Sequence, residues 1–307
     1  MQEKLQGVID QVGGVLLGKD HQIRQALACL VAGGHLLIED LPGMGKTILS
    51  HALARTLGLS YNRIQFTSDV LPADILGISI FDRNSAEFRF HPGPVFAQVV
   101  LADEINRTTP KTQSALLEAM EEGQVTVEGE TRALPEPFFV IATQNPSSQA
   151  GTYPLPESQL DRFLMRIELG YPDPVAEREL MRGQDRREML ETLEPRLTVE
   201  DLATLQAAVR EVQSTDALLD YVQRIVAHSR NASEFAWGLS PRGSLALLRA
   251  AQAWAFIDGR DHVVPEDVQA VLPPVVEHRL REAAGQGGGA SGVALAQRLL
   301  AVVDVVS

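Results

Sequence analysis

The residues best suited to chemistry form one short glycine-rich stretch, Asp40-Leu41-Pro42-Gly43-Met44-Gly45-Lys46-Thr47. The apolar run 35–38 precedes it and a helical pattern over 48–57 follows it, which is the strand, turn and helix context of a phosphate-binding loop. The two glycines let backbone N–H groups converge on anionic oxygens, and the following helix adds the positive end of its dipole. We predict that Lys46 contacts the β- and γ-phosphates of a nucleotide and that the Thr47 hydroxyl binds Mg²⁺.

One position departs from the usual pattern G-x-x-x-x-G-K-[ST], because Asp40 stands where the first glycine belongs. Taken alone, the stretch leaves open an ordinary glycine turn that binds nothing. The polar residues that follow later apolar runs decide between the two interpretations.

Two acids, Asp103 and Glu104, follow the continuous apolar run 99–102, which is typical of a strand buried on both faces of a parallel sheet. Acids at the carboxyl end of such a strand lie where open α/β sheets bind ligands. Asp103 could hold Mg²⁺ through water, and Glu104 could orient and deprotonate an attacking water. Two acids after a strand also occur by chance, but downstream of a phosphate loop the catalytic interpretation is favoured.

A third apolar run, 138–143, ends in Gln144-Asn145-Pro146. The amide of Asn145 is suited to hold a water or a γ-phosphate by hydrogen bonds. An asparagine before a proline is also ordinary turn chemistry, and this residue alone does not separate the two.

The composition bounds the class of protein. The chain has 307 residues, is 45% hydrophobic and carries a formal net charge of −13, which predicts about two domains and argues against broad binding of nucleic acid or an anionic membrane. The single cysteine, Cys29, excludes an intramolecular disulfide and fits a reduced core position. No apolar run approaches the ~18 residues of a membrane helix, and no leader pattern opens the chain, so we expect a soluble cytoplasmic protein without stable membrane insertion.

Periodicity and breakers give the elements that position these residues. We expect helices at 3–12, 20–32 and 110–122, strands at 61–66 and 164–168, and hairpins pairing 78–81 with 87–90 and 124–127 with 131–134. Beyond 172 the pattern predicts helices only, at 175–190, 198–213, 216–230, 240–257, 265–278 and 293–303, with a flexible glycine-rich break at 285–292.

Five ordered motifs carry a resemblance to a known family: EDLPGMGKT, GPVFAQVVLADEINR, ATQNP, LPESQLDRF and LSPRGSLALLRAA. Over about residues 10–280 the chain resembles the MoxR family of AAA+ ATPases. The resemblance implies an α/β fold, with a core of five parallel strands and a hairpin insert in residues 1–172, and a small all-helical lid domain in residues 173–307. It also implies that ATP or ADP sits between core and lid and is shared with a neighbouring subunit of a hexameric ring.

The family's residues carry over to matching positions. Asn145 matches the first sensor, Arg162 resembles the finger that reaches into the adjacent subunit, with Arg166 a weaker candidate, and Arg242 resembles the second sensor on the lid. The resemblance assigns catalysis to Glu104, Lys46, Asn145, Arg162 and Arg242, and Mg²⁺ binding to Thr47 and Asp103. It assigns nucleotide contact to Leu17, Gly18, Pro42, Gly43, Met44, Gly45, Lys46, Thr47, Ile48 and Arg242, with Leu17 and Gly18 lining the adenine pocket.

Local physics supports the placement of Arg242. Ser240 is a good N-cap and Pro241 a good first helical residue, so Arg242 should lie in the first turn of a helix, where its charge and the helix dipole both favour a phosphate. For either arginine the alternative is a surface salt bridge of ~0–1 kcal/mol.

By this resemblance the protein is a Mg²⁺-dependent ATPase that remodels or matures protein partners, possible clients including a von Willebrand A domain protein. Two other functions stay open, a nucleic-acid motor or loader on the same core and a nucleotide-dependent scaffold without turnover. The hairpin regions 78–92 and 124–137 lack the basic excess that nucleic acid needs, and the pairing of Lys46 with Glu104 weighs against a scaffold.

Overall fold

A five-stranded parallel sheet forms the centre of the N-terminal half of the computed structural model, which describes all residues except 147–150, 184–185, 284–291 and 306–307. This confirms the predicted five-stranded core. The strand order is β2 (Tyr61–Gln65), β5 (Val99–Asp103), β8 (Phe139–Gln144), β1 (His35–Glu39) and β9 (Phe163–Ile167). In register, Gln65 lies beside Asp103, and Ile38 lies beside Thr143, so the polar ends of β2, β5, β8 and β1 meet at one edge.

Side chains alternate between the two faces of the sheet and divide the apolar core into two clusters. Leu36 and Ile38 of β1 pack under α1 (Gln2–Val15), α2 (Asp20–Val31) and α3 (Lys46–Thr56). Leu37 points to the other face, where α4 (Pro72–Leu76) and α5 (Pro110–Glu122) cover the sheet. The predicted helices of this half therefore form, each within a few residues of its expected limits.

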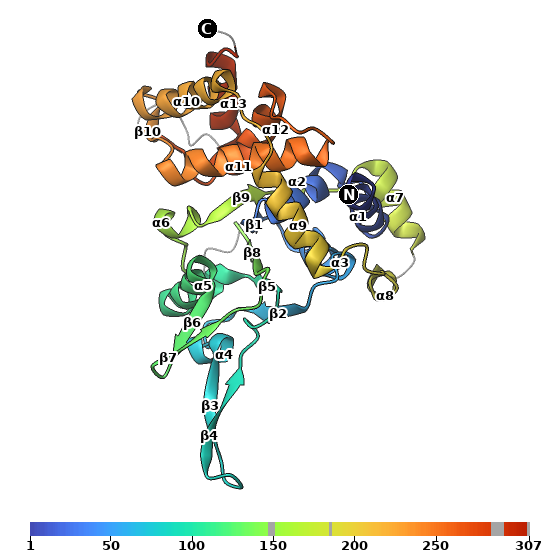
Figure 1. Cartoon of the computed structure of the whole chain (residues 1–307), viewed down its shortest axis with the longest axis vertical. Helices are drawn as coiled ribbons and strands as arrows, with labels where there is room; N and C mark the ends of the chain where they lie inside the picture. The colour runs from blue at the N-terminus through green and yellow to red at the C-terminus, as the bar shows by residue number, and fades with distance from the viewer. Residues whose placement is uncertain (147–150, 184–185, 284–291, 306–307) are drawn as a thin grey trace.

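Both predicted hairpins form, and they lie at the end of the molecule opposite the C-terminal helices (Figure 1). The longer hairpin pairs β3 (Gly77–Asp82) with β4 (Glu87–Pro92), and the shorter pairs β6 (Gln124–Val127) with β7 (Glu130–Ala133). The Arg132 guanidinium lies 4.0 Å from the centre of the Phe90 ring and so joins the two hairpins.

The lid is helical, built from α9 (Val199–Arg210), α10 (Asp216–Asn231), α11 (Pro241–Ile257), α12 (Pro265–Val276) and α13 (Gly292–Val302). Two details differ from the sequence prediction. The expected helix 175–190 is two helices, α7 (Pro174–Arg182) and α8 (Arg186–Glu191), because α7 ends at Gly183 with a φ of +43°. The expectation of helices alone was also wrong, since β10 (Phe235–Trp237) and β11 (Arg281–Glu282) form a short antiparallel pair. The predicted break at 285–292 lies outside the described residues, apart from Gly292 at the start of α13.

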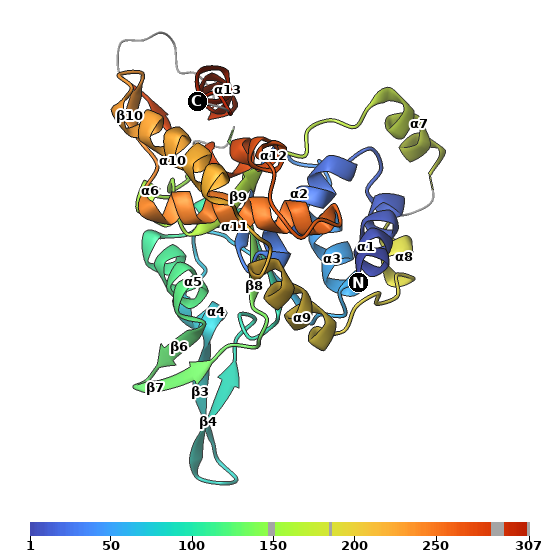
Figure 2. The same ribbon diagram turned by 45° about the horizontal axis from the view of Figure 1, so that its top comes forward.

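The segment that follows residue 172 packs against the core helices rather than the lid. Arg55 of α3 donates a hydrogen bond to the carbonyl of Glu191 at 3.0 Å, and Arg186 donates to the carbonyl of Gly14 at 3.1 Å. Figure 2 shows α8 beside α1 and α3. Residues after 172 therefore contribute to the surroundings of the phosphate loop as well as to the lid.

Arg279, just after α12, fastens the lid to strand β9. Its side chain is only 4% exposed; Nε donates to Asp161 at 2.6 Å and Nη2 to the carbonyl of Phe163 at 2.6 Å. Burial lowers the pKa of Arg279, and the adjacent Asp161 opposes that shift. A buried, fully bonded guanidinium at this point fixes the lid relative to the sheet.

In the described part of the chain, no helix combines the length and apolarity needed to cross a bilayer.

Candidate active site

A cavity of about 780 Å³ lies where β1 turns into α3, at the carboxyl edge of the sheet. It brings the predicted phosphate loop and the two predicted acids together. Its lining comprises Pro42, Gly43, Gly45, Lys46, Thr47, Ile48, His51, Arg63, Gln65, Asp103, Glu104, Leu190 and Glu191.

The loop backbone takes a shape that requires glycine at Gly43 and Gly45. Both residues have left-handed φ angles, +85° and +93°. A Cβ on Gly45 would also lie 2.6 Å from Cδ1 of Leu16, so both conformation and space exclude a side chain there. The helix α3 begins at Lys46 without a side-chain cap, which leaves its first N–H groups available to an anion in the cavity.

Asp40, the departure from the glycine pattern, braces the base of this loop. Its buried carboxylate accepts hydrogen bonds from the backbone N–H of Leu41 and of Gly170, each at 2.7 Å, and so ties the loop to the segment after β9. The Lys46 ammonium donates to the Asp40 carbonyl at 2.7 Å. The usual motif has a conformationally free glycine at this position. Here an aspartate fixes the loop through two charge-assisted hydrogen bonds.

The two predicted acids are held by a residue that the sequence analysis missed, Thr143 at the end of β8. Its hydroxyl donates to Asp103 Oδ1 at 2.6 Å and accepts from the backbone N–H of Glu104 at 2.9 Å. The other Asp103 oxygen accepts from Arg63 of β2 at 2.6 Å. The only sequence signals are that Thr143 is a polar residue near the end of a strand and that Arg63 is a charged residue within one.

Glu104 has a strained backbone, with φ +58° and ψ +48° in the left-handed region that side chains rarely adopt. Its carboxylate lies 3.0 Å from Nε of Arg107 and accepts a hydrogen bond from Gln65 Nε2 at 3.1 Å. These two partners, also missed from sequence, set the direction of the carboxylate.

Burial controls the titration of the basic groups in the cavity. It lowers the pKa of Lys46, while the carboxylates of Asp103, Asp40 and Glu104 raise it. The ring of His51 stacks on Tyr61 with centres 4.7 Å apart, and burial together with Arg55 lowers the pKa of His51, while Glu191 opposes that shift. Lys46 and Arg63 are the lysine and the arginine that line the cavity.

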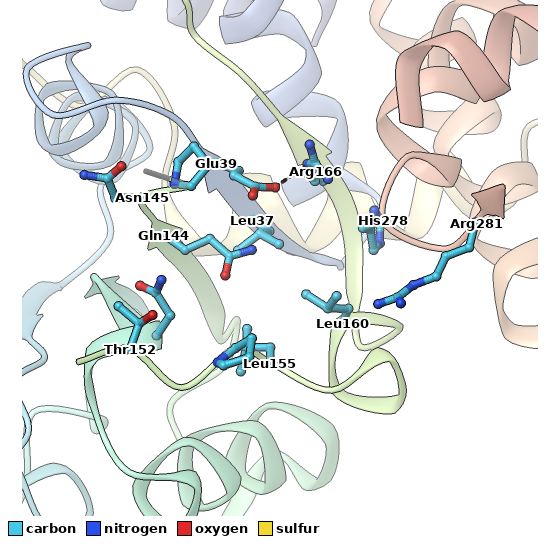
Figure 3. Close-up of a pocket in the computed structure, with 13 residues that line it drawn as sticks. Leu37, Glu39, Gln144, Asn145, Thr152, Leu155, Leu160, Arg166, His278 and Arg281 are labelled. Atoms are coloured by element: carbon cyan, nitrogen blue, oxygen red, sulfur yellow. Dashed lines mark ion pairs between the residues drawn. The ribbon is translucent and has the colours of Figure 1, made fainter. Parts of the chain in front are cut away.

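Asn145, the predicted sensor, does not line this cavity but an adjoining one of about 480 Å³ (Figure 3). The Glu39 carboxylate and Nε of Arg166 form an ion pair at 2.9 Å across this second cavity, and Figure 3 shows Asn145 apart from that pair. Arg166 is therefore paired with an acid of β1 within its own subunit.

Arg162 and Arg242 lie together in a third cavity, of about 460 Å³, away from the phosphate loop. Both form ion pairs with Glu121 of α5. The sequence analysis assigned Arg242 to nucleotide contact. In the structure the first turn of α11 places it beside Glu121, and it does not line the cavity around Lys46.

The predicted adenine-pocket residues also lie outside the phosphate-loop cavity. Gly18 has a φ of +67°, and a Cβ there would lie 2.9 Å from Cβ of Ala176 at the start of α7. The turn holding Leu17 and Gly18 nevertheless adjoins the loop, because the preceding Leu16 packs against Gly45.

Comparison with known proteins places the chain among ATPases. A model of the ATPase family associated with various cellular activities matches residues 35–165, and an AAA lid domain model matches residues 227–298. Chaperone MoxR1 of Mycobacterium tuberculosis is 41% identical over 290 residues, covering 90% of this chain and 75% of the relative. Protein YeaC of Bacillus subtilis is 48% identical over 272 residues, covering 89% and 85%. The crystal structure of a candidate ATPase from Cytophaga hutchinsonii matches 100% of this chain and 96% of its own, with a TM-score of 0.91 and 37% identity.

The brace at Asp40 gives a prediction that runs against the motif. Asp40→Gly restores the usual glycine, yet it should lower the free energy of unfolding by about 2–3 kcal/mol, because Gly170 and Leu41 lose a charged acceptor. Urea unfolding without nucleotide measures the change. The control is Asp69→Gly on an exposed turn, expected to shift stability by about 0.5 kcal/mol. Equal stability of Asp40→Gly and the parent would show that the brace stabilises nothing.

Proposed function

The chain belongs to the MoxR family of AAA+ ATPases, and on this premise we propose that it binds ATP with Mg²⁺ and hydrolyses it to ADP and phosphate. One observation carries the proposal: a single cavity holds the loop lysine, the loop threonine and both acids, Asp103 and Glu104. The loop follows β1 and the two acids lie at the end of β5, and the pairing of both strands with β8 brings these groups together. The reaction is phosphoryl transfer to water, which depends mainly on positioning and charge stabilisation.

The loop and Mg²⁺ ligands would bind the triphosphate. The N–H groups around Gly43 and Gly45 and the Lys46 ammonium supply donors to the phosphates. Thr47 and Asp103 offer hydroxyl and carboxylate oxygens, the ligand type that Mg²⁺ prefers, and both line the cavity. A Mg²⁺ ion held by Thr47 and Asp103 would supply charge neutralisation to the bound phosphates.

Glu104 is the proposed general base. Strain in its backbone and the contacts to Gln65 and Arg107 are consistent with a side chain held for chemistry rather than for folding. Gln65 and Arg107 both contact Oε2, so they would orient the carboxylate, and Oε1 is the oxygen proposed to accept the proton from water.

Arg162 and Arg242 are assigned to the site of a neighbouring subunit. Neither lines the cavity around Lys46, and both line another cavity with their side chains partly exposed. We propose a homo-oligomeric ring, hexameric by the family resemblance, in which these arginines reach the γ-phosphate of the nucleotide bound by the adjacent subunit. Asn145, in the adjoining cavity, is retained as a proposed sensor of that phosphate.

The hairpin β3–β4 supports a protein client. Its exposed apolar side chains are Ile78, Ile80, Phe81 and Phe88. The hairpin's ionised side chains, Asp82, Arg83, Glu87 and Arg89, sum to zero, which suits contact with a polypeptide better than with phosphates. The name of chaperone MoxR1 fits this assignment. A cytoplasmic location and a client with a von Willebrand A domain are proposed from the family resemblance alone.

The first functional prediction separates binding from turnover. Lys46→Ala should abolish ATP binding, while Glu104→Gln should bind ATP and lose turnover by at least ~10²-fold, because only Glu104 acts chiefly in the transition state. Calorimetric titration with ATP and a phosphate-release assay measure the two effects. Turnover by Glu104→Gln at the parent rate would remove Glu104 as the base.

The second concerns the shared site. Arg162→Ala should lose ~10³-fold or more in kcat, as expected of an arginine finger. Mixed with Lys46→Ala subunits, which keep Arg162, it should regain part of its activity at mixed interfaces. Turnover per subunit should also rise with protein concentration as rings form. A near-parental Arg162→Ala enzyme, or no recovery on mixing, would assign Arg162 to a surface salt bridge only.

The third concerns the client. Phe88→Ser, at a side chain that is 73% exposed, should leave basal ATPase unchanged and reduce its stimulation by a reduced, carboxymethylated, permanently unfolded polypeptide. Arg83→Ser on the same hairpin is the control and should keep the stimulation. Stimulation instead by double-stranded DNA, weakening steeply with salt, would favour the nucleic-acid alternative.

A further inference from the structure

Glu121 forms ion pairs with both arginines that are proposed to act on a neighbouring subunit, Arg162 and Arg242. It lies in the last turn of α5, and one carboxylate oxygen, Oε2, lies 2.8 Å from Nη2 of Arg162. The other oxygen, Oε1, accepts a hydrogen bond from Nη2 of Arg242. One carboxylate thus joins an arginine of the core to an arginine of the lid.

The backbones of both arginines are fixed by other contacts. Asp161 precedes Arg162 and accepts from the buried Arg279 at 2.6 Å and from the Ser240 hydroxyl at 3.1 Å. Ser240 is itself the N-cap of α11 and accepts from the backbone N–H of Gly243 at 3.0 Å. The direction of the two long side chains is therefore what remains for Glu121 to determine.

Helix α5 gains nothing locally from an acid at this position. Glu121 and Glu122 lie at the carboxyl end of the helix, where the dipole disfavours negative charge, and no basic residue shares the last turn. A residue that breaks a local rule points to a role outside its own element. For Glu121 the two guanidiniums supply that role; for Glu122 no ion pair is recorded in the described part of the chain.

The charges of Glu121, Arg162 and Arg242 suit a carboxylate that holds two guanidiniums side by side. Two guanidiniums placed side by side repel each other and, as flexible side chains, would diverge in solvent without a shared acceptor. One carboxylate between them leaves the group with a net charge of about +1, still attractive to the γ-phosphate. Because Arg162 and Arg242 remain partly exposed, with side chains 28% and 49% accessible, an approaching phosphate can reach them.

We propose that Glu121 is a positioning residue that aligns Arg162 and Arg242 for the phosphates of the nucleotide in the next subunit. The inference rests on the proposed function, since it requires a shared ATPase site. It makes one acid on α5 responsible for the geometry of a catalytic group contributed by two domains.

Glu121→Gln keeps the shape of the side chain and removes its charge, and Glu122→Gln makes the same change one residue away. At ring-forming concentration, Glu121→Gln should lower kcat about tenfold, equivalent to about 1.4 kcal/mol, with KM for ATP within about twofold of the parent. Glu122→Gln should match the parent. A parental kcat for Glu121→Gln would overturn the proposal, and an increased kcat would overturn it too, because it would make Glu121 a restraint on the arginines.

Two further arms exclude a general loss of structure. Glu121→Asp keeps the charge with a shorter reach and should recover part of kcat. Glu121→Gln mixed with Lys46→Ala should also recover activity, since the Lys46→Ala neighbour supplies intact arginines and an intact Glu121. No recovery in the mixture would place the effect of Glu121 in its own site and reject the inference. A parent protein without ATPase activity would instead reject the proposed function, so the two failures are distinguishable.

Discussion

The positions of Asp103 and Glu104 at the carboxyl edge of the sheet depend on the hydroxyl of Thr143. It is fully buried, donates to Asp103 at 2.6 Å and accepts from the backbone of Glu104 at 2.9 Å, so one side chain of β8 fixes both acids that follow β5. Parallel pairing of β5 with β8 makes this contact possible, since Ala102 lies beside Ala142 and the next residues of both strands emerge together. A shift of one residue would turn Thr143 to the other face of the sheet and leave Oδ1 of Asp103 without the Thr143 donor.

Structural features that depend on residues close together in the chain could be predicted from the sequence. The phosphate loop, the strand carrying the acids and the first turn of α11 each follow from local rules. Ser240 indeed caps that helix by accepting from Gly243. The division of 175–190 into two helices was missed because Gly183 breaks a pattern that is otherwise periodic. The pair β10–β11 was missed because its strands have only three and two residues and lie far apart in the chain.

The rest of the site was unpredictable because it depends on contacts between distant segments. The sequence around Arg242 predicts that it lies at the start of a helix, but not the direction in which that helix faces. That direction depends on the ion pair of Arg279 with Asp161, which joins the lid to β9. Asp40 is similar. Its sequence neighbours mark it only as a departure from a motif, whereas its role in the fold comes from its hydrogen bond to Gly170, in the segment that follows β9.

Helix α5 connects three parts of the molecule that act in different places. At its start, the buried Gln113 donates to the carbonyls of Ile105 at 3.1 Å and Thr108 at 3.3 Å, which ties the helix to the loop after Glu104. At its end are Glu121 and, directly after it, the hairpin β6–β7, whose Arg132 rests on Phe90 of the longer hairpin. A helix of 13 residues is stiff and roughly 20 Å long. A displacement of its first turn would therefore move Glu121 and the hairpin β6–β7 together. The loop after Glu104, the carboxylate that pairs with Arg162 and Arg242, and the two hairpins are thereby linked through a single helix.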